Sequence, residues 1–332
     1  MPNYREPHNS KVTDTDFVNL FESVGPNALA RKLGYSTPRP VYSRRERIEQ
    51  RLGRKLIAPK DMKALLREHG VESPARLHLK ITDGEVIIGS DAHYWPGEIS
   101  TAHRAFVHFC KERKQKLKAV VMNGDELDGA SISRHAPIGW EKRPSLIEEI
   151  DTVKERLGEI EKAVGAVCPL YWPLGNHDAR FSTRLATMVP EYARVHGTRL
   201  KDHFPLWKPC WSLFINDDVV VKHRIRGGIH ATRNNTLASG RTTITGHLHS
   251  LKVAPVTDYN GTRWGVDSGT LLEPGFDDAW GNQVVNYTED SPLDHRAGFI
   301  LLTFKNGELL WPEHVWVSAP GKVQFRGEVI SV

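Results

Sequence analysis

The sequence lacks any long apolar run and contains few cysteines. No apolar stretch approaches the ~20 residues that a membrane-spanning helix requires, so we expect no membrane insertion. The stretch MPNYREPHNSKVTDTD lacks the apolar core of a secretory signal peptide, which predicts a cytoplasmic protein. Cys110, Cys168 and Cys210 are scattered without a C-x-x-C pair, so we expect free thiols and no disulfide partner.

The excess positive charge is concentrated at one end of the chain. Residues 1–60 hold 12 Lys or Arg and 6 Asp or Glu, whereas the remainder holds 33 basic and 34 acidic residues. Such asymmetry points to a polyanionic partner, although a solvated basic face explains it equally well.

Residues 1–75 are expected to form a small helical module. The stretch TDTDFVNLFESVG has Phe17 and Phe21 at helical spacing and stops at Gly25 and Pro26. NALARKLG predicts a second short helix, and a third starts near Ser36 with both of its prolines in the first turn. A further helix is expected over 60–70. The expected inward stripe of the third helix is Val41, Ile48 and Leu52.

Residues 14–55 resemble a helix-turn-helix DNA-binding module of the kind found at the front of some phage enzymes. Two short helices, a tight glycine turn and a basic third helix carry this resemblance. It implies a nucleic-acid partner. The alternative explanations of the arginines are a solvated basic face or a helix that docks on another protein surface. The arginines that would contact nucleic acid are Arg39, Arg44, Arg45, Arg47 and Arg51.

Residues 76–332 read as a second, α/β domain. RLHLKITDGEVIIGSDAH is β-branched and alternating, which predicts paired strands, and the stretches up to 180 alternate strands with amphipathic helices. After residue 210 strands dominate, and 275–295 reads as a long, turn-rich loop. The alternation of strands and helices predicts sheets covered by helices.

Five apolar stretches of this domain each end in a short polar segment with metal-ligand side chains, which is where an open α/β sheet places its site. A glycine directly precedes Asp125, Asn176 and His247, permitting tight turns and close approach of the backbone. The candidate metal ligands are Asp91, His93, Asp125, Asn176, His223, His247 and His249.

The ligand types indicate the metal. Imidazole, carboxylate and amide oxygen suit Mn²⁺ first, with iron, Zn²⁺ or Ni²⁺ as alternatives. Seven candidates are too many for one tetrahedral centre but fit two divalent ions that share a carboxylate, for which Asp125 is the natural choice. Two ions about 3.5–4 Å apart form a clamp for displacement at phosphorus.

The motifs D-x-H, G-D-x-x-D, G-N-H-D, a strand-end histidine and G-H-x-H together resemble the calcineurin-like metallophosphoesterases. The resemblance covers roughly residues 80–300 and implies a double β-sandwich flanked by helices. It also implies that metal-held hydroxide attacks the phosphate and that two ligand sets form around Asp125 as the bridge. The sets are Asp91, His93 and His249 for one ion, and Asn176, His223 and His247 for the other.

The same resemblance implies that His177 protonates the leaving oxygen or stabilises the transition state, with Asp128 positioning its ring. The fourth motif departs from the usual His-Gly and reads KHRIRGGIH, which leaves His223 and His230 as rivals; we favour His223 because it ends the apolar run.

Other side chains are candidates for holding substrate. Arg180 is a candidate for gripping a phosphate oxygen, the alternative being a salt bridge, for which Asp178 is one candidate partner. Arg134 and His135 follow the second motif and are candidates for the substrate groove. The basic front end favours a nuclease or another phosphodiesterase acting on nucleic acid. A phosphomonoesterase and a catalytically inert DNA-binding protein are the alternatives.

Overall fold

The computed structural model describes residues 12–56, 58, 73–137, 140, 142–193, 195–272 and 294–332. They divide into two compact units, Met1–Glu72 and Ser73–Val332. The helix predicted over 60–70 and most of the loop predicted over 275–295 lie outside the described residues. Among the residues that are described, no helix has both the length and the apolarity to cross a membrane.

The first unit is helical and has its own core. Helix α1 (Asp14–Lys32) begins after Thr13, whose side chain accepts from the Asp16 N–H, and Gly25 breaks it with a φ of 78° and a ψ of 170°. Helix α2 (Arg39–Leu52) follows and ends at Gly53 in the left-handed conformation. The predicted break at Gly25 is therefore confirmed. The side chains of the core include Phe17, Phe21, Leu29, Val41, Ile48 and Leu56.

The prediction was wrong for one residue of the inward stripe of the third predicted helix. Leu52 is 51 % exposed. Gly53 turns the chain directly after it, and Leu56, which is buried, packs in the core instead.

The second unit contains a nine-stranded sheet that is parallel in its middle and antiparallel on one side. Its order is β15 (Glu328–Ser331), β14 (Lys322–Phe325), β13 (Glu313–Ala319), β11 (Gly298–Lys305), β2 (Gly84–Gly89), β3 (Leu117–Met122), β4 (Leu170–Pro173) and β5 (Trp207–Cys210), with β12 (Glu308–Leu309) paired to β11.

A six-stranded sheet packs against it. Its order is β1 (Leu77–Leu79), β6 (Leu213–Ile215), β7 (Val219–Val221), β8 (Thr242–Thr245), β10 (Gly261–Asp267) and β9 (Lys252–Asp258). The two sheets share a core because strand side chains alternate between faces. On β2, Val86 and Ile88 pack with Val221 and Ile244 of the other sheet. Ile87 points the opposite way, into a second cluster.

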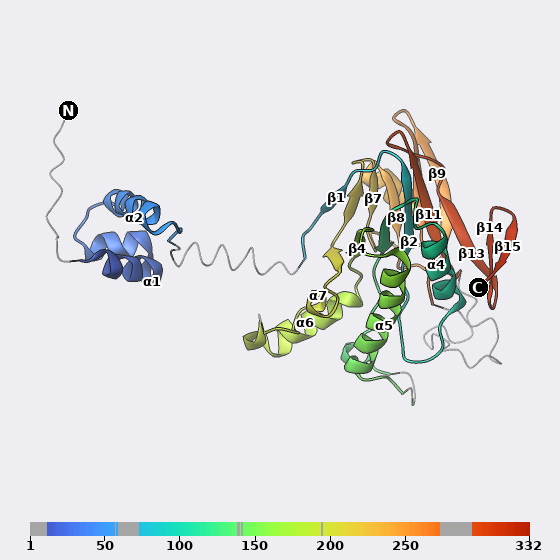
Figure 1. Cartoon of the computed structure of the whole chain (residues 1–332), viewed down its shortest axis with the longest axis horizontal. Helices are drawn as coiled ribbons and strands as arrows, with labels where there is room; N and C mark the ends of the chain where they lie inside the picture. Colours follow the sequence, from blue (N-terminus) through green and yellow to red (C-terminus); the bar gives the residue numbers. More distant parts are fainter. Residues whose placement is uncertain are drawn as a thin grey trace. The chain divides into compact units, whose positions relative to one another are not determined.

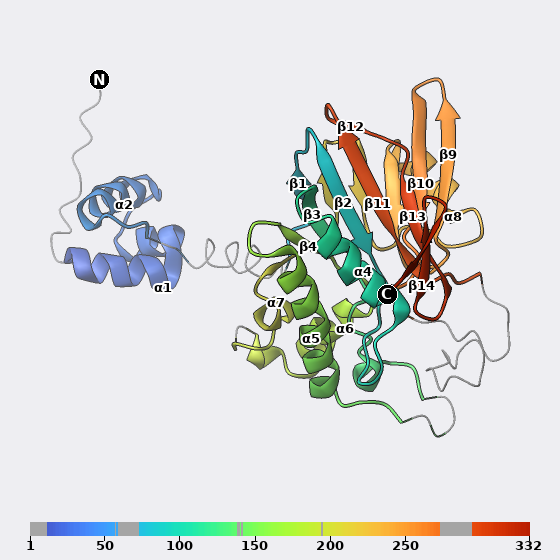
Figure 2. The ribbon, with the colours of Figure 1, turned by 45° about the vertical axis from the view of Figure 1, so that its right-hand side comes forward.

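Helices cover the outer faces of both sheets (Figures 1 and 2). Helices α4 (Thr101–Glu112) and α5 (Leu146–Val164) lie side by side over the nine-stranded sheet, where Phe106 and Leu157 pack with Ile87. A capping box at Ser145 and Glu148 starts α5. Helix α8 (Ala231–Ser239) packs on the six-stranded sheet. The predicted α/β class, two sheets flanked by helices, is confirmed.

Shorter elements complete this unit. They are the helices α6 (Asp178–Met188) and α7 (Leu200–His203) and the 3-10 turns at Ala130–Ile132 and Pro190–Tyr192.

The strands β1 and β2 are not paired with each other, which corrects the prediction for residues 77–89. β1 pairs with β6 in the six-stranded sheet, and β2 lies between β11 and β3 in the other. The Asn216 side chain holds the segment between β1 and β2, where the chain passes from one sheet to the other. It accepts from the Ile81 N–H at 2.8 Å and donates to the Ile81 carbonyl. The alternation along one stretch predicts strands but carries no information about a partner far away in the sequence.

Candidate metal centre

The candidate ligands follow five strands whose carboxyl ends meet at one edge of the two sheets. β2, β3 and β4 are parallel neighbours in one sheet, and β7 and β8 are parallel neighbours in the other. The ligand-bearing segments start directly after these strands, so the strand order itself brings them together. Among the described residues, three groups of side chains have ligand atoms within 4.8 Å of one another. The groups are Asp91, His93 and His249; Asp125, His223 and His247; and His93, Asp128 and His177.

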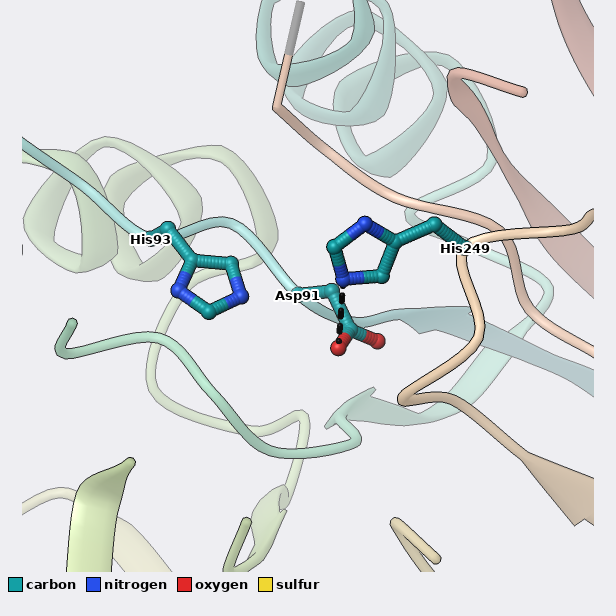
Figure 3. Close-up of side chains that lie close together, drawn as sticks. All are labelled: Asp91, His93 and His249. Atoms are coloured by element: carbon teal, nitrogen blue, oxygen red, sulfur yellow. Dashed lines mark hydrogen bonds and ion pairs between the residues drawn. The ribbon is translucent and has the colours of Figure 1, made fainter. Parts of the chain in front are cut away.

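The first group is built around the buried carboxylate of Asp91. His249 Nε2 lies 3.1 Å from Asp91 Oδ1, and the backbone N–H of His247 donates to Asp91 Oδ2 at 2.9 Å. Figure 3 shows the His249 ring over the Asp91 carboxylate with the His93 ring beside them. Burial opposes ionisation, but the neighbouring His223 and His249 hold the pKa of Asp91 well below its usual range. This site therefore favours positive charge.

The second group adjoins the first through His223. Its Nε2 lies 3.0 Å from Asp125 Oδ2 and 3.9 Å from Asp91 Oδ1. Its Nδ1 is 2.8 Å from the Asn123 carbonyl, to which it donates, so that Nε2 faces the carboxylates. Burial lowers the pKa of His223, but Asp91 and Asp125 outweigh it and raise the pKa to about 9.

Asn176 is the remaining predicted ligand, and it directly precedes His177, whose backbone N–H donates to Asp125 Oδ1 at 2.8 Å. The Asn176 Oδ1 atom is buried and has no hydrogen-bond partner among the described residues. A buried acceptor without a donor is costly, and a cation is the partner that carboxylate and imidazole neighbours attract. Asn176 and its neighbours therefore fit a divalent ion.

Two glycines let the backbone approach the ligands. A Cβ on Gly175 would lie 2.0 Å from Asp125 Oδ1, and one on Gly246 would lie 2.5 Å from Asp91 Oδ2. Any side chain at either position would collide with a candidate ligand. The close backbone approach that the sequence predicted at these turns is confirmed.

Asp128 orients two histidines at once. Its Oδ1 accepts from His177 Nδ1 at 2.7 Å and from His93 Nδ1 at 3.2 Å, while its Oδ2 accepts from the Trp95 indole at 3.2 Å. Although burial opposes it, these imidazoles hold the pKa of Asp128 well below its usual range. With Nδ1 directed at Asp128, the Nε2 atom of each ring points away from that carboxylate, and that of His177 contacts Arg180.

Arg180 contacts the catalytic candidates and not Asp178. Its Nη1 donates to the Asp128 carbonyl at 2.8 Å, and its Nη2 lies 3.0 Å from His177 Nε2. Arg180 also forms an ion pair, with Nη1 3.8 Å from Asp128 Oδ1, so the alternative of a salt bridge holds with a partner other than Asp178. The buried Asp178 carboxylate is already occupied by five donors. These donors are the backbone N–H groups of Gly175, Asp125, Glu126 and Leu127 and the indole of Trp172.

The remaining predicted residues lie elsewhere. His230 is exposed at the N-terminus of α8, whereas its rival His223 belongs to the second group. Arg134 and His135 are exposed after the turn Ala130–Ile132, and neither side chain contacts the three groups among the described residues.

In the first unit, the predicted DNA-contacting arginines divide into two sets. Arg44 and Arg51 both pair with Asp14, and Arg45 pairs with Glu49. Arg39 and Arg47 are exposed, and neither forms an ion pair with any residue that the structure describes.

Sequence reasoning missed several residues around the site. The His295 ring lies 4.6 Å from that of His249, and burial together with His249 lowers the pKa of His295 to about 4. Trp95 and Arg104 line a cavity of about 540 Å³ that also borders His93. Only their nearness to a D-x-H motif could have indicated Trp95 and Arg104, whereas His295 lies far from every motif in the sequence.

Comparisons with known proteins find distant structural likenesses. Vps29 complexed with zinc from Entamoeba histolytica is 13 % identical and has a TM-score of 0.38, over 74 % of this chain and 98 % of that one. A predicted phosphoesterase from Streptococcus pneumoniae is 11 % identical with a TM-score of 0.30, over 76 % and 99 %. A serine/threonine phosphatase from Saccharomyces cerevisiae, similar to human PP5, is 14 % identical with a TM-score of 0.35, over 83 % and 97 %.

No protein-family model and no curated protein matches the chain. The TM-scores of the structural likenesses are low, so the function of this chain is argued from its own residues.

Proposed function

We propose that the chain is a phosphodiesterase of the calcineurin-like metallophosphoesterase type, which uses two divalent metal ions to hydrolyse nucleic acid. The observation that carries the proposal is the convergence of carboxylate, imidazole and amide ligands from five strand ends of two sheets. A packing role does not explain why so many polar side chains, several of them buried, face one another at one edge.

The ligand atoms support two adjacent ion sites. Asp91, His93 and His249 would hold one ion, and Asn176, His223 and His247 the other, with Asp125 between them. His223 Nε2 lies 3.0 Å from Asp125 Oδ2 and 3.9 Å from Asp91 Oδ1, and this proximity supports two adjacent ion sites. When bound, such ions supply a nucleophile at neutral pH and neutralise charge on the phosphate.

The side chains of the chain itself position and protonate the substrate. Asp128 accepts from His177 Nδ1, so the proton on that atom is fixed and Nε2 faces Arg180. Arg180 offers its guanidinium to a phosphate oxygen when it turns from His177. That movement frees His177 Nε2 to hold a proton for the leaving oxygen.

The cavity beside His93 supports a diester over a monoester. A phosphodiester carries a second ester group, and this cavity of about 540 Å³ gives that group a place next to the first ligand group. Trp95 and Arg104 are among the residues that line it, and an aromatic and a basic residue suit a planar or anionic group. A phosphomonoester would leave the cavity unused.

The helical first unit supports a nucleic-acid substrate. Its α2 carries Arg39 and Arg47 exposed, which suits contact with a phosphate backbone. Binding there would raise the local concentration of a nucleic acid around the tethered metal centre.

The experiment is hydrolysis of bis-p-nitrophenyl phosphate by the full chain. Protein loaded with Mn²⁺ should hydrolyse the diester, and EDTA or the substitution Asp125→Asn should remove at least ~99 % of the rate. Hydrolysis that survives both would refute the metal-dependent mechanism. As a matched control, Asp151→Asn changes an exposed aspartate on α5 and should leave the rate intact.

A further inference from the structure

The chain between His223 and α8 forms an exposed basic loop, defined here as residues 224–230. Every residue of this loop is exposed. The surrounding stretch 222–233, KHRIRGGIHATR, contains basic residues and no Asp or Glu. Within the described part of the chain, Arg224, Arg226 and Arg233 form no ion pair. Their charge is therefore not neutralised within the structure.

The basic loop lies beside the metal centre. It begins directly after the candidate ligand His223. A Cβ built on Gly227 would lie 3.9 Å from Cδ2 of Leu248, the residue between His247 and His249. Arg224, the first residue of the loop, is therefore adjacent in sequence to a residue of the second ligand group.

The shape of the loop is fixed by α8. The buried Asn235 side chain accepts from the Arg226 N–H at 3.1 Å and donates to the Arg226 carbonyl at 3.1 Å. This two-point clamp holds the backbone of the loop, so the arginine side chains start from a defined position. Loops held by rigid elements are typical binding segments.

The loop also exposes apolar side chains. Ile229 is 82 % exposed and Ile225 is 40 % exposed, and both lie among the arginines. Arginines attract phosphates, whereas aliphatic side chains contact sugars and bases, so the combination suits a nucleotide strand better than an inorganic anion. The arginines of α2 differ, because Arg44 and Arg51 are already paired with Asp14.

We propose that the basic loop, through Arg224 and Arg226, binds the phosphodiester backbone of a nucleic-acid strand next to the phosphate held at the metal centre. This inference rests on the proposed function and names the surface that selects a polymeric substrate. It adds a polyanion contact in the unit that carries the ligands to the contact proposed for Arg39 and Arg47 of the first unit.

The test measures binding of the full chain to fluorescein-labelled single-stranded DNA by fluorescence polarisation, in EDTA so that no hydrolysis occurs. Arg224→Ala combined with Arg226→Ala should weaken binding at least tenfold. The slope of log K against log salt should become shallower by about 1.4, because two phosphate contacts are lost. Arg224→Lys combined with Arg226→Lys keeps the charge and should retain most of the affinity.

The matched control is Lys116→Ala combined with Lys118→Ala. Both lysines are exposed near the start of β3, at the opposite end of that strand from Asp125, so the control removes the same charge from a remote surface. The melting temperature of each variant verifies folding. Wild-type affinity in the alanine variant, or an equal loss in the lysine control, would overturn the proposal.

An equal loss of binding to polyglutamate would also overturn it, because the loop would then be a general cationic surface. Hydrolysis of bis-p-nitrophenyl phosphate by the wild-type protein is measured separately. Its absence would refute the proposed function, whereas the DNA-binding result decides the loop alone.

Discussion

At the scale of single residues, five of the seven candidate ligands share a backbone conformation that ordinary side chains rarely adopt. Asp91, His93, Asp125, His247 and His249 all have positive φ values, between 42° and 72°. Each such residue costs of the order of 1–3 kcal/mol, and such strain gathers at functional sites. The fold tolerates this cost where side chains have to turn sharply off a strand end toward a common point.

Substitution of two adjacent residues separates catalysis from metal binding. His177→Ala should lower kcat by about 10²–10⁴ and leave the metal content unchanged, because the imidazole is hydrogen-bonded to Asp128 and the proposed function assigns it to neither ion. Asn176→Ala should instead lose metal, because it removes the buried amide oxygen. Metal content is measured by mass spectrometry of the dialysed protein. Loss of metal from the His177 variant would assign that ring to the ligands.

Two Gly→Ala substitutions should have different effects, one on metal affinity and one on the free energy of unfolding. Gly175→Ala should weaken metal binding at least tenfold, because its Cβ would collide with Asp125 Oδ1. Gly158→Ala lies inside α5, where a Cβ meets nothing within 4 Å, and should raise the free energy of unfolding by about 0.5–1 kcal/mol. Isothermal titration with Mn²⁺ and chemical denaturation measure the two effects. Equal metal affinity in both variants would contradict the close packing at Gly175.

At the scale of elements, buried carboxylates hold the loops that carry the ligands. Asp178, at the start of α6, accepts from the loop after β3 and from Gly175 before Asn176. Glu149, on α5, accepts from the backbone of Gly129 at 2.6 Å, directly after Asp128. The helices therefore fix the loops of the centre through backbone N–H groups.

Asp178→Asn should lower the free energy of unfolding by at least ~2 kcal/mol, because an amide NH₂ cannot accept from the donors that face the carboxylate. The matched control Asp151→Asn removes an exposed surface pair and should change stability by less than ~0.5 kcal/mol. Urea denaturation compares the two. Equal stabilities would show that Asp178 is not the link between these loops.

The sequence predicts the ligands better than their supports. Each ligand segment follows an apolar strand, and parallel strands end at a common edge, so the approximate position of His223 or His247 follows from local pattern. The roles of Asp178 and of Asp128 as a partner of both His93 and His177 depend on contacts between different loops. The pairing of β1 with β6 was missed for the same reason, since alternation does not name a distant partner.

At the scale of the whole molecule, the metal-free centre should make stability depend on pH. Asp128 and Asp125 outweigh burial and raise the pKa of His93 to about 9, and Asp91 and Asp125 do so for His223, against 6.5 ordinarily. The stability that these protonated rings contribute is complete below pH 6.5 and is lost as the pH rises through 9. The carboxylates then face one another without a compensating charge.

The melting temperature in EDTA should therefore fall between pH 6.5 and about pH 9, the range spanned by the ordinary and raised pKa values of His93 and His223. The melting temperature of protein loaded with Mn²⁺ should fall less over this pH range, because metal binding replaces the protons as the source of positive charge. A melting temperature of the metal-free protein that rises over this range would contradict the proposed electrostatics of the centre. His93→Gln with His223→Gln should flatten the dependence.

The most direct test of the central claim compares two small substrates with the Mn²⁺-loaded full chain. The cavity beside His93 and the two ligand groups predict a kcat/KM for bis-p-nitrophenyl phosphate at least ~10-fold above that for p-nitrophenyl phosphate. A preference for the monoester would contradict the account and make the chain a phosphomonoesterase. No hydrolysis of either ester by metal-loaded protein would make the centre inert.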